Sequence, residues 1–314
     1  MMKPLAAVTG ATGFIGRRLV PALARAGWQL RLLMRRDPVI PEWEGVRPEI
    51  VAGALSDAAA LERLVEGADV VIHVAGLIKA ARRAEFFAIN EGGAAALAAI
   101  TQRMVPRAHF ILISTLAARE PRLSDYAASK RAGEDIVRKM LGTHATVVRP
   151  TAVYGPGDRE TLAFFKLAQL KRVPLIGREE ALATLIHVDD LVSLIVALAA
   201  QAPGGAVMSA CDARPAGYRW REVFSVAADA VGNSGAPLYH APGPLLHSVA
   251  MLGDIARLFG YANMLTSEKL RELRHLDWSI STTERARVPG WSPQFSLEAG
   301  FADAVSWYRS VGWL

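Results

Sequence analysis

Short apolar runs alternate with longer amphipathic stretches through the first half of the chain. The apolar runs predict strands over Leu5–Thr9, Gln29–Met34, Glu49–Ala52, Val70–Val74, Phe110–Ser114 and Ala145–Arg149. The stretches between them predict helices over Ile15–Arg25, Ala58–Val65, Phe86–Gln102 and Tyr126–Met140. This order is typical of βαβ units with right-handed crossovers, so the sequence predicts an α/β fold built on a doubly wound parallel sheet.

The alternation ends after Pro150, where prolines divide the chain into shorter pieces. We therefore expect a smaller and less regular C-terminal lobe beside the sheet. The apolar residues of that lobe are expected to pack within helices rather than to line a pocket. Those that we single out are Met251, Leu252, Leu258 and Phe259.

Composition excludes a disordered chain, because 52% of the 314 residues are hydrophobic and 21% are charged. Cys211 is the single cysteine, so no internal disulfide can form. No Cys/His spacing suits a structural metal, and we expect no metal site. The apolar run Leu191–Ala200 is about half of the roughly 20 residues that span a bilayer. With no signal-peptide pattern at the start, we expect a cytoplasmic protein without a membrane span.

The net charge is +6, from 36 Lys and Arg against 30 Asp and Glu. The basic residues are scattered and form no stripe interleaved with aromatic residues. Nucleic acid is therefore not an expected partner. We expect a small-molecule substrate instead.

A glycine-rich turn follows the first predicted strand. Residues Gly10 to Gly16 have the pattern G-x-x-G-x-x-G and open the first predicted helix. Gly10 permits the tight turn, Gly13 lets the backbone approach a pyrophosphate, and Gly16 allows close packing of helix and strand. The turn predicts dinucleotide binding through Gly10, Thr12, Gly13, Phe14, Ile15 and Gly16.

The end of the second predicted strand bears on which dinucleotide binds. Met34 stands where an acidic residue would accept hydrogen bonds from the adenosine ribose, and Arg35 and Arg36 follow it. Guanidinium groups suit a ribose 2′-phosphate, so NADP(H) is favoured and NAD(H) stays possible. The alternative is that both arginines are solvated loop residues.

Three further residues carry candidate chemistry. Tyr126 and Lys130 stand four apart in a predicted helix and share one face. A nearby ammonium, together with an oxidised nicotinamide, is expected to lower the pKa of Tyr126 for acid/base work. Ser114 and Thr115 end the fifth predicted strand, where Thr115 could bind a substrate oxygen. The structural alternative for Ser114 and Thr115 is a cap at the strand end. For Tyr126 and Lys130 it is an exposed pair on a helix.

These motifs, in this order, resemble the extended short-chain dehydrogenase/reductases, also called the NAD-dependent epimerase/dehydratase family. The resemblance covers nearly the whole chain. It rests on Thr9–Gly16, Gly53–Asp57, His73–Gly76, Ile89–Gly92, Ser114–Thr115, Tyr126–Lys130, Arg149–Pro150, Val153–Asp158, His187–Asp190, Gly290–Pro293 and Trp307–Tyr308.

The resemblance implies roles residue by residue. Thr115 binds the substrate oxygen, Tyr126 is the acid/base, Lys130 holds the nicotinamide ribose, and Asn90 supports the proton path. The cofactor is also expected to contact Leu55, Asp57, Ala75, Gly76 and Pro150. His187 and Asp189 look like the structural return of the chain to the cofactor domain. A Rossmann-like domain over residues 1–158 and 184–212 and a substrate-binding lobe over 159–183 and 213–314 follow as expectations.

Departures from the family pattern narrow the substrate. Leu116–Ala117 replace the Asp-Glu pair of sugar-nucleotide dehydratases, and Ala183 stands where many epimerases have a phosphate-binding arginine. The region from Pro242 to Ile280 is more similar to the dihydroflavonol-reductase and 3β-hydroxysteroid-dehydrogenase-like branch. An apolar or small carbonyl substrate is therefore expected.

We interpret the chain as an NAD(P)(H)-dependent oxidoreductase that moves a hydride between nicotinamide and a carbonyl or alcohol carbon. Two alternatives stay open. One is a nucleotide-sugar epimerase with tightly bound NAD. The other is a non-catalytic NADPH-binding subunit similar to the short-chain-dehydrogenase-like subunit of respiratory complex I. The resemblance also suggests a homodimer formed through the helices that follow Phe86 and Tyr126.

Overall fold

The computed structural model describes residues 3–36, 40–258 and 266–314. Its centre is a seven-stranded parallel sheet in the order β11-β6-β5-β4-β1-β2-β3. The strands are β1 (Leu5–Thr9), β2 (Gln29–Met34), β3 (Glu49–Ala52), β4 (Val70–His73), β5 (His109–Ile113), β6 (Ala145–Pro150) and β11 (Val207–Ala210). The predicted doubly wound α/β fold is confirmed.

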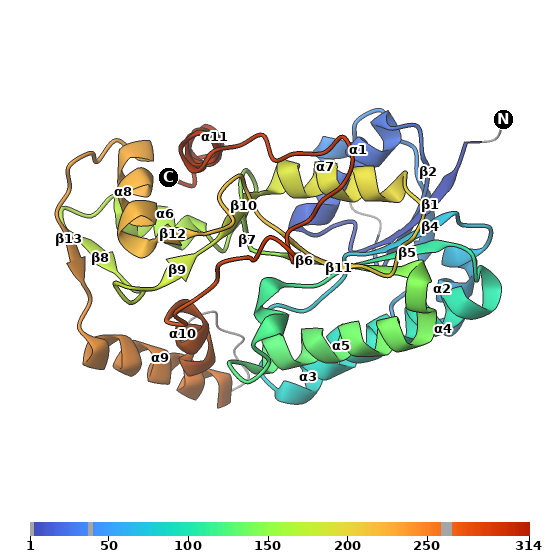
Figure 1. Ribbon diagram of the computed structural model, residues 1–314, viewed down its shortest axis with the longest axis horizontal. Coiled ribbons are helices and arrows are strands. Elements are labelled where there is room, and N and C mark those ends of the chain that lie inside the picture. The colour runs from blue at the N-terminus through green and yellow to red at the C-terminus, as the bar shows by residue number, and fades with distance from the viewer. Residues whose placement is uncertain (1–2, 37–39, 259–265) are drawn as a thin grey trace.

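Helices cover both faces of this sheet (Figure 1). One face carries α1 (Phe14–Arg25) and α7 (Val188–Ala199), and the other carries α2 (Ala58–Val65), α4 (Gly93–Met104) and α5 (Asp125–Leu141). The helix predicted over Phe86–Gln102 is divided into α3 (Arg83–Phe87), a π-helical turn (Ala88–Gly92) and α4. Short 3-10 turns occupy Pro41–Trp43, Leu116–Arg119 and Gly142–His144.

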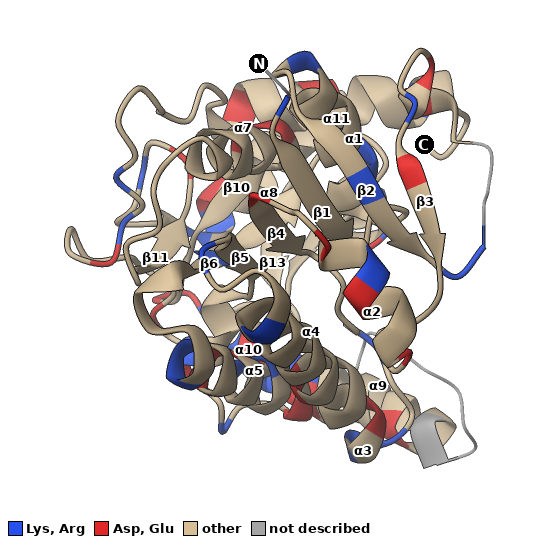
Figure 2. Ribbon diagram, turned by 90° about the vertical axis from the view of Figure 1, so that its right-hand side faces the viewer, with Lys and Arg blue, Asp and Glu red and all other residues tan. Residues whose placement is uncertain are grey.

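Apolar side chains fill the space between the sheet and each helical layer. Val8, Leu23 and Leu191 are fully buried on one face, and Val71 and Leu97 are fully buried on the other. Strands β1, β4 and β5 contain no charged residue, whereas charged residues are frequent on the helices and loops around the sheet (Figure 2). A parallel sheet covered on both faces requires such continuous apolar strands.

The smaller lobe combines short strands with helices of varied length. Its pieces are α6 (Leu162–Ala168), β8 (Val173–Leu175), β9 (Leu182–Ala183), β12 (Tyr218–Arg219), α8 (Trp220–Ala230), β13 (Leu238–His240), α9 (Gly243–Leu258), α10 (Ser267–Leu273) and α11 (Leu297–Ser310). β7 (Ala152–Tyr154) pairs with β10 (Leu185–His187), β8 with β13, and β9 with β12. Aromatic rings form its core, including Phe165 and Phe301 with centroids 5.0 Å apart.

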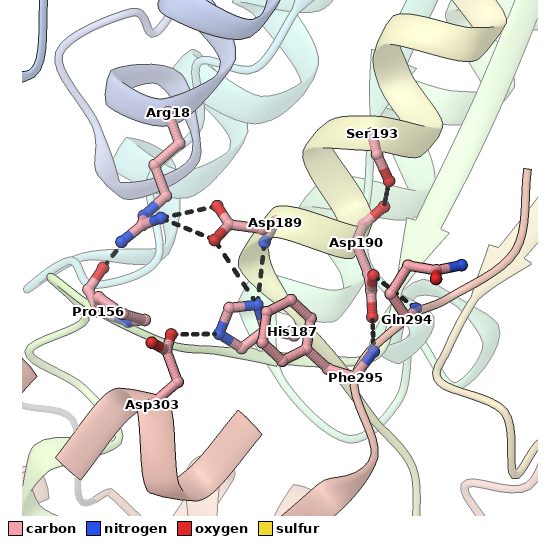
Figure 3. Close-up of polar contacts among 9 residues, drawn as sticks. All are labelled: Arg18, Pro156, His187, Asp189, Asp190, Ser193, Gln294, Phe295 and Asp303. Atoms are coloured by element: carbon pink, nitrogen blue, oxygen red, sulfur yellow. Dashed lines mark hydrogen bonds and ion pairs between the residues drawn. The ribbon is translucent and has the colours of Figure 1, made fainter. Parts of the chain in front are cut away.

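A polar joint ties the C-terminal segment to the sheet domain (Figure 3). Arg18 of α1 donates to both carboxylate oxygens of Asp189 at 2.7 and 2.9 Å. His187 is fully buried, stacks on Phe295 at 3.8 Å, and lies 3.2 Å from Asp303 of α11 through Nε2. His187 and Asp189 thus hold α1, α7 and α11 together, which fits the structural interpretation of these residues.

Candidate active site

The glycine-rich turn joins β1 to α1 with no room for larger residues. Gly10 has a φ of +76°, and a Cβ there would lie 2.5 Å from the backbone nitrogen of Ala75. A Cβ on Gly16 would lie 2.2 Å from the carbonyl oxygen of Gly10. Glycine is therefore required at both positions by close backbone contacts, as the sequence pattern predicted.

The N-terminus of α1 is suited to an anion. Gly13 caps the helix with no side-chain hydrogen bond, and the first turn contains no acidic residue. Thr12 is exposed, while Phe14 and Ile15 are half-buried. The N–H groups of this first turn and the helix dipole therefore remain available to a pyrophosphate.

Two buried hydroxyls lie at the carboxyl edge of the sheet. Ser114 follows β5 and Thr151 follows β6, and the backbone nitrogen of Ser114 donates to the carbonyl oxygen of Val148 in β6 at 2.8 Å. The Oγ of Ser114 and the Oγ1 of Thr151 have no hydrogen-bond partner within the described residues. Ligands bind at this edge in doubly wound sheets, and unpaired buried hydroxyls fit a polar ligand there. Together with the turn, these hydroxyls fit a dinucleotide.

His73 secures the loop that faces the turn. Its Nδ1 lies 2.7 Å from the hydroxyl of Thr9, which also accepts a hydrogen bond from the backbone nitrogen of Ala75 at 3.4 Å. Burial, and next the charge of Lys130, lower the pKa of His73 to about 3. This histidine is therefore neutral and structural, and it positions the Ala75–Gly76 backbone beside the turn.

The predicted adenine-side residues lie past β2 and β3. Arg35 and Arg36 are exposed directly after β2. Asp57 caps α2 by accepting a hydrogen bond from the backbone nitrogen of Ala60 at 3.0 Å. Leu55 packs on Gly93, where a Cβ would approach it to 2.7 Å. Leu55 and Asp57 therefore have structural roles in addition to the cofactor contacts predicted for them.

Tyr126 lies in the first turn of α5, two residues after Ser124, the helix cap. Burial raises the pKa of Tyr126 to about 12, a hydrogen bond with Thr115 lowers it, and the negative charge of Glu272 raises it. The phenol is therefore protonated at neutral pH. Thr115 itself caps the 3-10 turn that follows, through the backbone nitrogen of Ala117 at 3.3 Å.

Lys130 lies one helical turn after Tyr126 and is buried. Its ammonium donates to the carbonyl oxygen of Ile113 in β5 at 2.7 Å. Burial lowers the pKa of Lys130 to about 8, opposed by the charge of Glu134. The protein's own groups thus raise the pKa of Tyr126, because burial of the phenol and the charge of Glu272 outweigh the hydrogen bond with Thr115. Our expectation that Lys130, together with an oxidised nicotinamide, lowers this pKa stays a prediction.

Asn90 is buried in the π-helical turn and uses its whole amide group. Its nitrogen donates to the carbonyl oxygen of Leu77 at 3.0 Å and to Oγ of Ser129 at 2.9 Å, and its oxygen accepts from the nitrogen of Leu77 at 2.7 Å. A Cβ on Gly76 would lie 3.2 Å from the Asn90 oxygen and 3.5 Å from the Lys130 ammonium. The structure thus brings Gly76, Asn90 and Lys130 together. Asn90 clamps the loop after β4 to α5, and its part in a proton path stays a prediction.

Two residues near the site were not singled out from the sequence. Ser124 donates a hydrogen bond to the buried carboxylate of Glu272, which Lys269 also contacts at 2.8 Å. Glu272 lies on α10, 148 residues from Ser124. A serine two residues before the tyrosine signals a helix cap, but no local pattern identifies its distant partner.

Comparison with known proteins agrees with this arrangement. The model of the NAD dependent epimerase/dehydratase family matches residues 6–210. A ceramide reductase from Caulobacter vibrioides (strain NA1000 / CB15N) is 44% identical over 309 residues, which cover 98% of this chain and 95% of that protein. NADH dehydrogenase [ubiquinone] 1 alpha subcomplex subunit 9, mitochondrial, from Dictyostelium discoideum is 31% identical over 205 residues, 62% of this chain and 55% of that protein.

Among solved structures, MoeE5 in complex with UDP-glucuronic acid and NAD superposes with a TM-score of 0.71. It is 20% identical and covers 98% of this chain and 99% of that chain, which shows a common fold. The chain belongs to the NAD-dependent epimerase/dehydratase family. It is an NAD(P)-dependent oxidoreductase and uses a nicotinamide cofactor.

Proposed function

We propose that this protein reduces the ketone group of a ceramide-type lipid with NADPH. The observation that carries the proposal is the 44% identity to a ceramide reductase over 98% of the chain. Ala183 argues against the alternative of a nucleotide-sugar epimerase. This residue is buried in β9, where many epimerases have a phosphate-binding arginine, so no cation at this position can hold a nucleotide sugar.

Tyr126 is proposed as the proton donor. With its pKa at about 12, the phenol is protonated at neutral pH and can give its proton to the carbonyl oxygen. Thr115, which hydrogen-bonds the same phenol, would hold that oxygen and stabilise its developing charge. A bound nicotinamide supplies the hydride for the carbonyl carbon.

The groups around Tyr126 hold it in position. Lys130 anchors α5 to β5 through Ile113, and Asn90 anchors the same helix to the loop after β4 through Ser129. Ser129 in turn donates to the carbonyl oxygen of Tyr126 at 2.8 Å. Lys130 would hold the nicotinamide ribose, and Gly76 and Pro150 would line the ring. Fixed geometry of this kind lets a reductase bring hydride and carbonyl carbon close together.

The preference for NADPH rests on Arg35 and Arg36. Both are exposed at the end of β2, and the nearby backbone nitrogen of Gly53 donates to the carbonyl oxygen of Met34 at 3.0 Å. Two guanidinium groups at this strand end suit a ribose 2′-phosphate.

The binding role of each lobe is also part of the proposal. Residues 1–158 and 184–212 would bind the cofactor, and residues 159–183 and 213–314 would bind the lipid. The homodimer through the helices that follow Phe86 and Tyr126 stays a prediction, as does the cytoplasmic location.

The proposal is tested by substrate comparison. Purified protein is given NADPH and either a detergent-dispersed ceramide-type ketone or UDP-glucose, and products are measured by mass spectrometry. We expect reduction of the ketone and no change in the sugar. Epimerised sugar with no added cofactor would identify a nucleotide-sugar epimerase instead. Bound NADPH that no ketone oxidises would contradict the proposed reduction.

A further inference from the structure

Helix α9 presents an apolar face to solvent. Leu245, Met251 and Leu252 are exposed by 56%, 57% and 63%, and Val249 and Ile255 are exposed by 40% and 42%. These are five of the twelve large apolar side chains that are exposed in the described part of the chain. Met251 and Leu252 therefore do not pack inside the lobe as we expected, while the side chain of Leu258 and all of Phe259 lie outside the described residues. Such a concentration on one helix marks an interaction surface.

The other side of α9 is attached to the lobe. Ala250 and Gly253 are buried, and they recur at the spacing of one helical face. Asp254 accepts hydrogen bonds from the backbone nitrogen of Ser267 at 3.1 and 3.3 Å, which fixes α9 to α10. The exposed residues therefore form a stable outward face on a helix that is already anchored.

Basic groups line a hollow beside α9. His247 of this helix lines it together with Arg178, Arg271 and Arg274. Arg178 pairs with Glu180 at 2.9 Å, and Arg271 lies 3.9 Å from Glu268. Arg274 makes no ion pair with any residue in the described ranges. Asp254, an acidic residue of α9, turns its carboxylate to the backbone of Ser267 in α10. The lining of the hollow contains three arginines and no carboxylate, which is complementary to the headgroups of anionic lipids.

Helix α10 lies between this face and the candidate active site. Helix α10, against which α9 is fixed, donates from Arg271 Nε to the carbonyl oxygen of Leu123 at 3.0 Å. The same helix contacts Ser124 through Glu272, at the turn of α5 that carries Tyr126. A surface that binds at α9 therefore lies one helix away from the proposed proton donor.

We propose that α9 docks this protein on an anionic lipid bilayer, with Leu245, Val249, Met251, Leu252 and Ile255 inserted at the interface. This inference rests on the proposed function, because a two-chain lipid ketone resides in a membrane. Helix α9 has 16 residues, and no helix in the described ranges is long and apolar enough to cross a bilayer. The proposed docking places α9 in the plane of the surface.

Vesicle sedimentation without cofactor or substrate tests the docking. The probes are vesicles of pure phosphatidylcholine and of phosphatidylcholine with phosphatidylglycerol. We expect the wild-type protein to bind the anionic vesicles, and the double variant Met251→Glu/Leu252→Glu to bind them at least about tenfold more weakly. Met104→Glu, at an exposed position that ends α4, is the matched control and should bind as the wild type does.

Reduction of a detergent-dispersed ceramide-type ketone is measured in parallel. The double variant should keep this activity and its thermal unfolding temperature, because both side chains are exposed. Equal vesicle binding by wild type and double variant would overturn the docking proposal. A wild-type protein that is a dimer, with a double variant that is a monomer, would overturn it as well. Vesicle binding without ketone reduction would leave the docking in place and overturn the proposed function alone.

Discussion

Glu272 of α10 accepts a hydrogen bond from Ser124, the residue that caps the helix carrying Tyr126. This contact joins the smaller lobe to the first turn of α5. The carboxylate also places a negative charge near the phenol and helps to raise the pKa of Tyr126. A residue of the smaller lobe is thereby coupled to the proposed proton donor.

Replacing Glu272 by Gln should shift the pH dependence of ketone reduction. The amide can still accept from Ser124 but lacks the charge, so the pKa of Tyr126 should fall by less than about one unit. The phenol then loses its proton at lower pH, so the fall of kcat/KM on the alkaline side should begin at a lower pH than in the wild type. Glu268→Gln on the same helix is the control. A profile that is unchanged, or that moves to higher pH, would contradict this coupling.

Gly16→Ala should weaken cofactor binding about tenfold or more. The added Cβ would lie 2.2 Å from the carbonyl oxygen of Gly10, so α1 must move away from the turn that is proposed to bind the pyrophosphate. Gly204→Ala is the matched control, because a Cβ there meets no atom within 4 Å. Titration of NADPH fluorescence measures both affinities. Equal binding by the two variants would show that the turn does not hold the cofactor.

Lys130→Met should change how stability depends on pH. The folded pKa of Lys130 is about 8, below the ordinary value of 10.5, so between these values the unfolded chain binds more protons than the folded protein. The wild-type unfolding free energy should therefore rise with pH relative to the variant, by about 3 kcal/mol across this window. Urea unfolding at pH 7.5, 9 and 10.5 measures the difference. A constant difference would mean that Lys130 has an ordinary pKa.

Arg35→Ala/Arg36→Ala should lower the affinity for NADPH and leave that for NADH nearly unchanged. A guanidinium pair that binds a 2′-phosphate contributes charge-assisted hydrogen bonds that NADH cannot form, so a loss of about tenfold or more is expected. Arg25→Ala, at the opposite end of α1 from the turn, is the control. Equal losses for both cofactors would identify Arg35 and Arg36 as solvated loop residues.

The sequence predicted six of the seven strands of the sheet, because each of the six is a mainly apolar run between turn residues. β11 was not predicted as a strand, although it completes the sheet beside β6. This strand has only four residues, Val207–Ala210, and only its pairing with β6 reveals its place in the sheet.

Local spacing predicted the tight glycine turn between β1 and α1 and the placement of Tyr126 and Lys130 one turn apart in α5. Their roles in cofactor binding and catalysis stay predictions. The direction of the Tyr126 pKa shift was not predictable, because it depends on burial and on Glu272 from a distant segment. The hydrogen bonds by which Asn90 joins the loop after β4 to α5 were also not predictable. They require a π-helical turn inside a segment whose sequence predicts one regular helix. Tertiary packing decides both features.

Transfer of deuteride from labelled NADPH to a ceramide-type ketone tests the central claim most directly. We predict that the wild-type product carries one deuterium on the new carbinol carbon. Tyr126→Phe should form no product while binding NADPH with nearly unchanged affinity, and Tyr239→Phe, at an exposed tyrosine, should behave as the wild type. Labelled product from Tyr126→Phe at the wild-type rate, or no labelled product from the wild type, would contradict the account.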